Sequence, residues 1–236
     1  MSGSRCTFKV NGEEIKANVG ETLVEAALGG GIVLPHDCCT GQCETCRVRV
    51  VSGEIDDVGT AEKGTVLGCL SVLQSDVEIT FDPVPLVTTV KGKVETIRDI
   101  TPGYLEVHVR IEKNFTWIAG QYIRATFAGF PPRDYSPTMP LALDAEEDVL
   151  VFHIKIYPDS IVSSKFNSKI KPGHDVKIKG PFGSCFLRSQ TKPMLLTSTG
   201  TGFAPIWAIS VAATLGQPNR PMKLIVGSRT SDGLYM

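Results

Sequence analysis

Four cysteines in the first third of this chain constrain its fold and chemistry more than any other feature. Cys38, Cys43 and Cys46 lie within nine residues, and Cys69 follows after twenty-two intervening residues. The N-terminus has no secretion signal and no apolar run reaches the length of a membrane span, so we expect a cytoplasmic protein without membrane contact. Because the cytoplasm keeps thiols reduced, a tight group of cysteines favours a metal site over disulfides.

The spacing of these cysteines indicates the kind of metal. The pattern C-x4-C-x2-C with a distant fourth cysteine is typical of plant-type ferredoxins, in which four thiolates hold a [2Fe–2S] cluster. Small residues on such a loop let backbone amides approach the sulfurs and stabilise the reduced cluster. Zinc is the alternative, but its sites usually carry two CxxC knuckles, and this sequence has one. We therefore predict Cys38, Cys43, Cys46 and Cys69 as the ligands of a [2Fe–2S] cluster.

The other cysteines and one acidic residue need separate interpretations. Cys39 does not fit the spacing, and we interpret it as a non-ligand that can substitute after damage to the cluster. Cys6 and Cys185 are expected to be small buried residues. Glu44 lies between two predicted ligands, where a carboxylate disfavours the addition of an electron. Two hypotheses stand: Glu44 lowers the cluster potential, or it points into solvent.

The net charge of −1 hides an uneven distribution along the chain. Residues 1–83 contain 6 Lys and Arg against 13 Asp and Glu, a net of −7, and residues 84–236 contain 18 against 12, a net of +6. We expect the two parts to attract each other, or the acidic part to steer toward a partner protein; two unrelated solvated surfaces are the alternative. The basic residues are scattered, which argues against binding to nucleic acid.

Residues 1–83 predict a small α+β domain. Its strands are expected at residues 6–10, 15–17, 47–51 and 77–81. Asn11-Gly12 is a hairpin signal, and Thr22 with Glu25 forms a capping box for a short helix that Gly29-Gly30-Gly31 ends. Asp82-Pro83-Val84-Pro85 then marks a linker, because its two prolines block both helix and strand pairing.

From residue 87 onward the chain predicts an antiparallel β-barrel followed by a βαβ unit. Alternating segments separated by Gly and Pro turns are typical of a barrel, and they cover residues 91–97, 104–111, 122–127, 150–156 and 175–178. The βαβ pattern comprises a strand at 194–197, a glycine loop, a helix at 204–213 and a strand at 222–226. The chain stops soon after this second strand, so we expect the parallel sheet to be incomplete.

Three short motifs follow the cysteine loop in a fixed order. In Arg133-Asp134-Tyr135-Ser136, arginine grips phosphate through paired hydrogen bonds, tyrosine offers a flat face and serine offers a hydroxyl. Gly180-Pro181-Phe182-Gly183 comes next. A glycine loop at residues 199–205 then lies between a strand and a helix, where backbone N–H groups approach a pyrophosphate. Each motif alone is weak, whereas their order is specific.

In this order of motifs the sequence resembles the ferredoxin-NADP reductase superfamily, in particular reductase components of multicomponent aromatic-ring (Rieske-type) oxygenases. The resemblance covers nearly the whole chain and implies a multidomain protein. It comprises an α+β ferredoxin (β-grasp) domain at residues 1–83, an antiparallel β-barrel that binds FAD at 87–190, and the start of an α/β nicotinamide-binding domain at 191–236. Relatives continue well beyond this point, so the last domain looks truncated.

The resemblance also implies roles for individual residues. Arg133 would hold a flavin phosphate, while Tyr135 lies against the flavin ring and Ser136 bonds its redox-active nitrogen; Tyr135 and Ser136 are the predicted catalytic residues. A second flavin segment would contain His153 and Lys155, and a phosphate loop would contain Ser163 and Ser164. The nicotinamide-phosphate loop would contain Gly200, Thr201, Gly202 and Pro205, and the predicted ribose contacts are Ser228 and Arg229. Asp159-Ser160 replaces two glycines that are common in relatives.

The function implied by the resemblance is electron transfer. A nicotinamide donates two electrons as hydride and an iron–sulfur cluster accepts one, so a flavin between them reconciles the two. The implied cofactors are the [2Fe–2S] cluster, FAD and NADH or NADPH: Ser228-Arg229 favours NADPH and the oxygenase resemblance favours NADH. The implied partner is a terminal oxygenase component, or its ferredoxin, in the degradation of aromatic compounds. The alternatives are a reductase for a di-iron hydroxylase or a deoxysugar dehydratase, and an iron–sulfur and flavin carrier without hydride entry.

Overall fold

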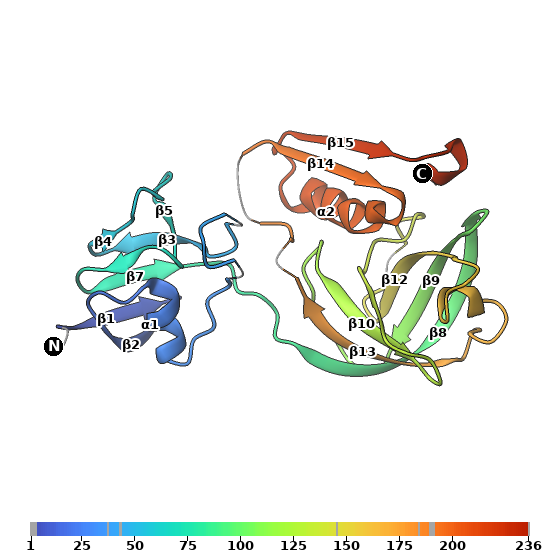
Figure 1. The fold of residues 1–236 in the computed structure, drawn as a ribbon, viewed down its shortest axis with the longest axis horizontal. Helices are drawn as coiled ribbons and strands as arrows, with labels where there is room; N and C mark the ends of the chain where they lie inside the picture. Colours follow the sequence, from blue (N-terminus) through green and yellow to red (C-terminus); the bar gives the residue numbers. More distant parts are fainter. Residues whose placement is uncertain are drawn as a thin grey trace. The chain divides into compact units, whose positions relative to one another are not determined.

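The computed structural model divides the chain into two compact units, Met1–Val84 and Pro85–Met236 (Figure 1). It describes residues 4–36, 38–42, 44–144, 146–183, 185–188 and 192–235. The predicted ligand Cys43 lies outside these residues. The boundary between the units falls inside the proline-containing segment that was predicted as a linker. The further division of the second unit at residue 190 stays a prediction.

The first unit contains a five-stranded mixed sheet in the order β2-β1-β7-β3-β5. Its strands, with a separate β4–β6 pair, are β1 (Arg5–Val10), β2 (Glu13–Asn18), β3 (Arg47–Ser52), β4 (Ile55–Asp56), β5 (Thr65–Leu67), β6 (Val72–Leu73) and β7 (Val77–Thr80). β1 runs antiparallel to β2 and parallel to β7. The predicted hairpin turn is confirmed, since Asn11 and Gly12 have φ values of 49° and 89°, and positive φ at both positions suits a tight turn between twisted strands.

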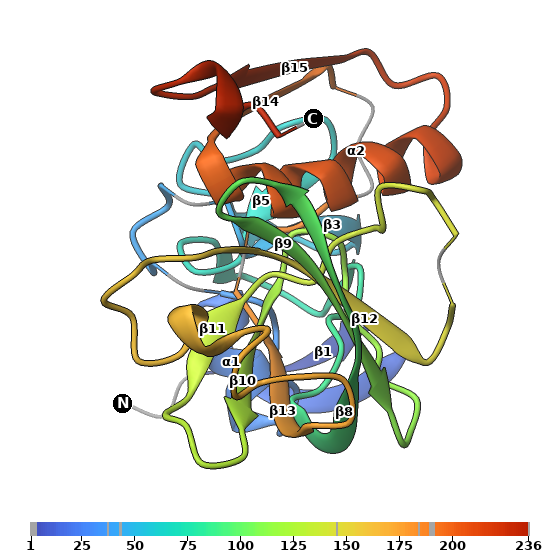
Figure 2. The same ribbon diagram turned by 90° about the vertical axis from the view of Figure 1, so that its right-hand side faces the viewer.

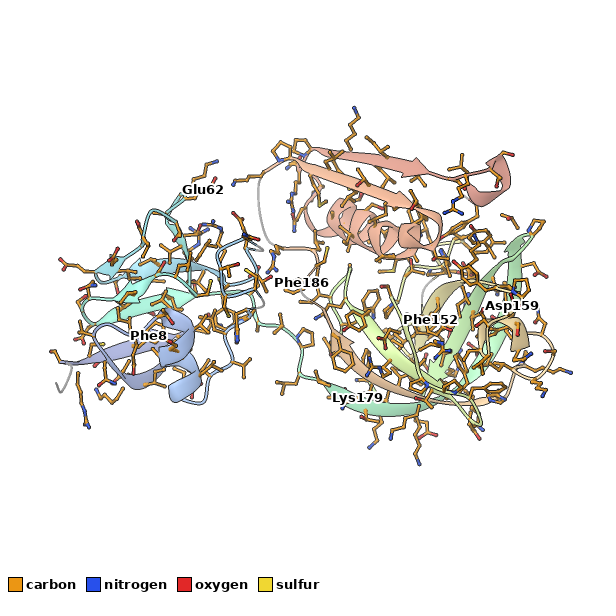
Figure 3. All side chains as sticks on the ribbon, in the orientation of Figure 1. Phe8, Glu62, Phe152, Asp159, Lys179 and Phe186 are labelled. Carbon is orange, nitrogen blue, oxygen red and sulfur yellow. The ribbon has the colours of Figure 1, made fainter. Side chains whose placement is uncertain are left out.

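The one α-helix among the described residues of this unit, α1 (Leu23–Gly29), begins with the predicted capping box. The Glu25 backbone N–H donates to Thr22 Oγ1 at 3.2 Å, and the Thr22 N–H donates to the Glu25 carboxylate at 3.0 Å. These bonds satisfy N–H groups that a helix start otherwise leaves unpaired. The helix covers the sheet in Figure 1, and its buried side packs into a core around the fully buried Phe8, which Figure 3 labels.

The second unit is built on a six-stranded antiparallel sheet in the order β11-β10-β13-β8-β9-β12. The strands are β8 (Thr88–Thr101), β9 (Tyr104–Ile111), β10 (Tyr122–Phe127), β11 (Arg133–Tyr135), β12 (Val149–Lys155) and β13 (Asp175–Phe182). Thr138, just beyond β11, forms a bridge to Val151 of β12, so the two edges of the curled sheet meet. The predicted barrel is therefore barrel-like, and its interior is apolar, with a core that includes Phe127 and Phe152. Figure 3 labels Phe152 within this core.

The last part of the second unit is a strand–helix–strand element. It comprises β14 (Met194–Thr199), the turn η2 (Gly200–Gly202), α2 (Phe203–Gly216) and β15 (Met222–Gly227), and the unit also contains the short turns η1 (Ser163–Lys165) and η3 (Ser231–Gly233). β14 and β15 are parallel, as predicted. Figures 1 and 2 show α2 between this strand pair and the barrel, where Ala208 and Ile209 pack between Leu196 of β14 and Ala119 of the barrel unit.

One expectation about burial was wrong. Cys6 is buried as predicted, but Cys185 is exposed. The backbone carbonyl of Cys185 faces Gly120 so closely that a Cβ on that glycine would lie 2.4 Å away, and the next side chain, Phe186, is buried. The main chain and Phe186 thus occupy the space that the thiol was expected to fill. Within the described residues, no helix is long and apolar enough to cross a membrane.

Candidate functional site

Strand pairing brings together two of the predicted cluster ligands. Cys46 directly precedes β3 and Cys69 lies two residues beyond β5; these strands pair antiparallel, with Arg47 opposite Leu67. The residue before one strand and those after the other therefore meet. The Cys69 N–H donates to Cys46 Sγ at 3.4 Å, and the Gly68 N–H donates to the Cys46 carbonyl at 2.9 Å.

The loop that carries the other ligands is turned by left-handed residues. Cys39 and Gly41 have φ values of 52° and 79°, in the left-handed region that favours glycine, and a Cβ on Gly41 would lie 2.6 Å from Leu70 Cδ1, so the Leu70 side chain would have to move. The Thr40 N–H donates to Cys38 Sγ at 3.4 Å. Cys39 itself is exposed. Taken alone, the described residues hold no group of three His, Cys, Asp or Glu side chains suited to a metal ion, and the predicted set of four includes the undescribed Cys43.

The Arg133-Asp134-Tyr135 segment forms the edge strand β11, which sorts its side chains onto two faces. Asp134 forms an ion pair with Arg124 of β10 at 2.8 Å, while Arg133 and Tyr135 face the opposite side because side chains alternate along a strand. The Tyr135 ring lies 6.0 Å from Phe152 of β12, and burial raises its pKa to about 12 although the nearby Arg133 opposes the shift. Tyr135 therefore stays neutral at physiological pH.

The predicted second flavin segment lies on β12, where two of its side chains have protein partners. The ammonium group of Lys155 sits 5.3 Å from the ring centre of Tyr104 and 5.4 Å from that of Tyr157. His153 is buried, with its Nδ1 3.4 Å from the hydroxyl of Tyr235 and its Nε2 3.5 Å from the Glu106 carboxylate. His153 therefore lies on the same face of the sheet as Glu106, its cross-strand neighbour on β9.

The predicted phosphate loop is organised by Ser160. Its hydroxyl accepts hydrogen bonds from the N–H groups of Val162 at 3.3 Å and Ser163 at 3.0 Å. The Ser163 hydroxyl accepts from the Tyr157 N–H at 3.1 Å, and the Ser164 hydroxyl donates to the Ser160 carbonyl. Two backbone donors of this loop are therefore already engaged by the Ser160 hydroxyl.

The glycine loop lies next to the flavin segments of the barrel. Gly200 has φ 53° and opens the turn, and Pro205 occupies the first turn of α2, where a missing N–H costs nothing. The buried Thr138 hydroxyl donates to the Ala204 carbonyl at 2.7 Å, which ties the segment after β11 to the start of α2. β12 contacts the turn η2 as well. The structure thus brings the Arg-Asp-Tyr-Ser segment, β12 and the glycine loop together.

A buried carboxylate, that of Glu106, contacts β12 and the segment after β11. Glu106 of β9 is 4% exposed, and its Oε1 is 2.9 Å from His108 Nε2 while its Oε2 accepts the Leu141 N–H at 2.9 Å. Burial alone would raise the pKa of Glu106, but the hydrogen bonds with His108 and Leu141 and the nearby His153 ring outweigh it and hold the pKa well below its usual range. Glu106 is therefore a buried anion stabilised by its hydrogen-bond partners.

The sequence matches two domain families over most of its length. Residues 8–74 match the 2Fe-2S iron-sulfur cluster binding domain, and residues 91–186 match the oxidoreductase FAD-binding domain. The naphthalene 1,2-dioxygenase system ferredoxin–NAD(P)(+) reductase component of Pseudomonas putida is 30% identical over an alignment 238 positions long. The alignment covers 95% of this chain and 71% of that protein. A reductase component of naphthalene 1,2-dioxygenase/salicylate 5-hydroxylase systems in a Ralstonia species is 32% identical over 237 residues, 94% of this chain and 70% of that protein.

The chain belongs to this family of ferredoxin–NAD(P)(+) reductase components. A solved structure supports the assignment: the cytochrome P450 reductase GcoB of Amycolatopsis is 27% identical, with a TM-score of 0.59 over 98% of this chain and 74% of that one. The reductase is therefore an oxidoreductase with one domain for a [2Fe–2S] cluster and one for FAD.

The residues of this reductase fit both cofactors. N–H groups aimed at Cys38 Sγ and Cys46 Sγ suit thiolates that share charge with a cluster. On the barrel, Arg133 donates one hydrogen bond, 2.8 Å, to the carbonyl of its neighbour Pro132, and its other N–H groups have no acceptor among the described residues. A free guanidinium beside a half-buried tyrosine ring suits a ligand that combines phosphate with a flat ring system.

The predicted ribose contact of the reductase lies at the same sheet edge as the glycine loop. β14 and β15 are parallel and Thr199 is in register with Gly227, so the loop after β14 and Ser228-Arg229 after β15 emerge side by side. Both Ser228 and Arg229 are exposed. This edge is where ligands bind in open α/β sheets.

Sequence patterns did not predict the buried polar side chains that support these segments, above all Glu106, His108 and Thr138. The alternation along β9 places Glu106 and His108 on one face, and polar residues on one face of a strand usually indicate solvent. That face is instead covered by Phe203 of α2 and by Tyr235, which packs on Tyr104. The signal in the sequence was the pair Glu106 and His108, two positions apart on one face of a mostly apolar strand.

Proposed function

We propose that this reductase takes hydride from NAD(P)H at the glycine loop, and that the electrons pass through FAD to the [2Fe–2S] cluster and on to an oxygenase component. When bound, the flavin converts a two-electron donor into a source of single electrons. The observation that carries the proposal is the hydrogen bond from Thr138 to the Ala204 carbonyl, because it joins the segment that follows Arg-Asp-Tyr-Ser to the helix that follows the glycine loop.

The barrel residues would bind and orient the flavin. Arg133 offers free guanidinium donors to a phosphate, and Tyr135, neutral at physiological pH, offers a flat face that excludes water. Ser136, half-buried directly after β11, would hydrogen-bond the redox-active ring nitrogen. The backbone of His153 to Lys155 and the loop at Ser163 and Ser164 would complete the site.

The strand–helix–strand element would hold the nicotinamide cofactor. Backbone N–H groups at Gly200, Thr201 and Gly202 would receive the pyrophosphate, and Pro205 would fix the direction of α2. The exposed apolar residues Leu195, Leu224 and Ile225 support a larger α/β nicotinamide-binding domain, because parallel sheets are ordinarily covered on both faces.

The electron acceptor would be an oxygenase component or its ferredoxin in the breakdown of an aromatic compound. Support comes from the relatives, which are named as reductase components of naphthalene dioxygenase and related systems. We favour NADH as the donor. The exposed Arg229 offers a positive charge near the proposed ribose contact, which makes NADPH the competing donor to test.

The proposal is tested by mixing the purified full chain, loaded with FAD and cluster, with NADH or NADPH in a stopped-flow spectrometer under anaerobic conditions. We expect flavin absorbance to bleach rapidly, followed by reduction of the cluster, with NADH faster than NADPH. If neither nucleotide bleaches the flavin while dithionite does, hydride does not enter here, and the chain is an iron–sulfur and flavin carrier instead. If the visible spectrum of the intact protein lacks an iron–sulfur contribution, the cluster assignment is wrong.

A further inference from the structure

Glu44 occupies an unusual position between two predicted cluster ligands. It follows Cys43 directly, and its backbone has φ 55°, in the left-handed region that favours glycine. Its side chain is 50% exposed, so burial does not hold it in this conformation. Another interaction must therefore stabilise this turn of the cysteine loop.

Arg47 supplies that interaction through a two-point contact. Its Nε donates to Glu44 Oε2 at 3.2 Å and its Nη2 donates to Glu44 Oε1 at 3.0 Å, and the Arg47 backbone N–H donates to the Glu44 carbonyl at 3.1 Å. Such a bidentate fork fixes the orientation of both groups. The turn from Glu44 to Arg47, which contains Cys46, is thus closed by side chain and backbone together.

The same guanidinium also connects this turn to the rest of the sheet. Arg47 Nη1 donates to the Thr60 carbonyl at 3.2 Å and to Thr65 Oγ1 at 3.1 Å. The Arg47 side chain is only 14% exposed, unlike that of a flexible surface arginine. Exposed ion pairs contribute little to stability, because their side chains lose conformational freedom on pairing and because solvent screens the charges. The Arg47 guanidinium is held by four hydrogen bonds, so the loss of freedom is shared among all four contacts.

The pairing also decides which charge a cluster experiences. A unit charge roughly 10 Å from a redox centre, at an effective dielectric constant of about 20, changes the equilibrium constant for reduction by about tenfold. An unpaired carboxylate at Glu44 would oppose reduction by that factor, whereas a carboxylate bound to Arg47 leaves a pair that is nearly neutral. Neither of the two hypotheses for Glu44 holds alone, since the side chain is exposed but paired.

We propose that Arg47 is a positioning residue of the iron–sulfur site: it clamps the Glu44 turn and cancels the Glu44 charge, so that the paired carboxylate does not oppose reduction of the cluster. This inference rests on the proposed function, because it requires a cluster on Cys38, Cys43, Cys46 and Cys69.

The test measures the midpoint potential of the cluster by redox titration followed by electron paramagnetic resonance, in the full chain with cluster and FAD. The variants are Glu44→Gln, Arg47→Gln, the double variant and Arg47→Lys. Arg49→Gln is the matched control, because Arg49 lies on the same strand, is exposed and has no resolved ion pair among the described residues. Iron content and visible absorption on purification report how firmly each variant holds its cluster.

We expect Arg47→Gln to lower the equilibrium constant for cluster reduction by about tenfold, which is about 59 mV for one electron. Glu44→Gln should raise it by a similar factor, the double variant should lie within about twofold of the wild type, and Arg49→Gln should change it far less. Arg47→Lys keeps the charge and loses the fork, so we expect a nearly unchanged potential with a lower cluster content.

Other results separate the possible failures. If Arg47→Gln loses the cluster while Arg49→Gln keeps it, the clamp is supported and the Glu44→Gln potential alone tests the charge effect. If Arg47→Gln keeps its cluster with a potential equal to that of Arg49→Gln, or if Glu44→Gln has the wild-type potential, the inference is overturned. A wild-type protein without a cluster overturns the proposed function instead.

Discussion

The carboxylate of Glu106 accepts a hydrogen bond of 2.9 Å from the backbone N–H of Leu141, and so anchors the segment that follows the Arg-Asp-Tyr-Ser motif to β9. The other carboxylate oxygen contacts His108 at 2.9 Å. Because this carboxylate is buried and hydrogen-bonded, its removal should lower the stability of the fold around the predicted flavin site more than the removal of a surface carboxylate would.

Acid should therefore destabilise the protein partly through Glu106. Its folded pKa is depressed, so its contribution to stability is complete above the unfolded value of about 4.3 and is lost as pH falls toward the lower folded value. We expect Glu106→Gln to lower the free energy of unfolding at pH 7 by about 1.5–3 kcal/mol and to flatten the decline in stability below about pH 4.3. Urea unfolding between pH 3 and pH 7 measures both effects. The exposed Glu112→Gln serves as control, and an unchanged acid profile in Glu106→Gln would contradict the prediction.

The link between the barrel and α2 can be tested at Thr138. Thr138→Val keeps the shape of the side chain and removes the hydroxyl that bonds the Ala204 carbonyl, so we expect a loss of about 1 kcal/mol in unfolding free energy. Thr126→Val is the comparison, because its half-buried hydroxyl has no hydrogen bond to the described residues. Equal effects of the two substitutions would show that the Thr138 bond contributes no stability. A slower reduction of the flavin by NADH in Thr138→Val alone would link this bond to hydride transfer.

Flavin binding should depend on Arg133 and not on the arginine that faces away from it. Arg133→Ala removes the free guanidinium and should weaken FAD binding by about 10- to 100-fold, the range expected for one hydrogen bond to a charged group. Arg124→Ala removes a neighbouring arginine whose partner is Asp134 on the other face of the sheet, and it should retain FAD. Fluorescence titration of the flavin-free protein with FAD measures both constants. Stoichiometric flavin in Arg133→Ala would refute the role of the motif.

The cysteines offer a direct comparison within one loop. Cys69→Ser should lose the cluster, because Cys69 is a predicted ligand and already lies beside Cys46. Cys39→Ser should keep the iron content and visible spectrum of the wild type, because the Cys39 thiol is exposed. Iron analysis and absorption spectra of the two purified variants measure the cluster content of each. Loss of the cluster in Cys39→Ser would shift the ligand assignment from Cys38 to its neighbour.

Local patterns predicted the elements and motifs of this protein well. The Asn11-Gly12 turn and the Thr22 capping box need only neighbouring residues, so their geometry follows from short-range sterics and hydrogen bonding. The strands and helices that were predicted agree with the structure to within a few residues, apart from the longer β8 and β13. The short strands β4, β5, β6 and β11 were not predicted. The spacing of the cysteines and the order of the motifs were likewise sufficient to identify the family.

By itself, then, the sequence determined the kind of most elements, the family and its cofactor domains, because period, turn residues and motif order are properties of neighbouring positions. Only the tertiary structure decided which polar side chains are buried and with whom they pair. Glu106 became a buried anion because α2 and Tyr235 cover its strand face, and Arg47 became a clamp because segments far apart in the chain bring Thr60 and Thr65 to it. Burial and pairing arise from contacts between distant segments, which periodicity along one strand does not contain.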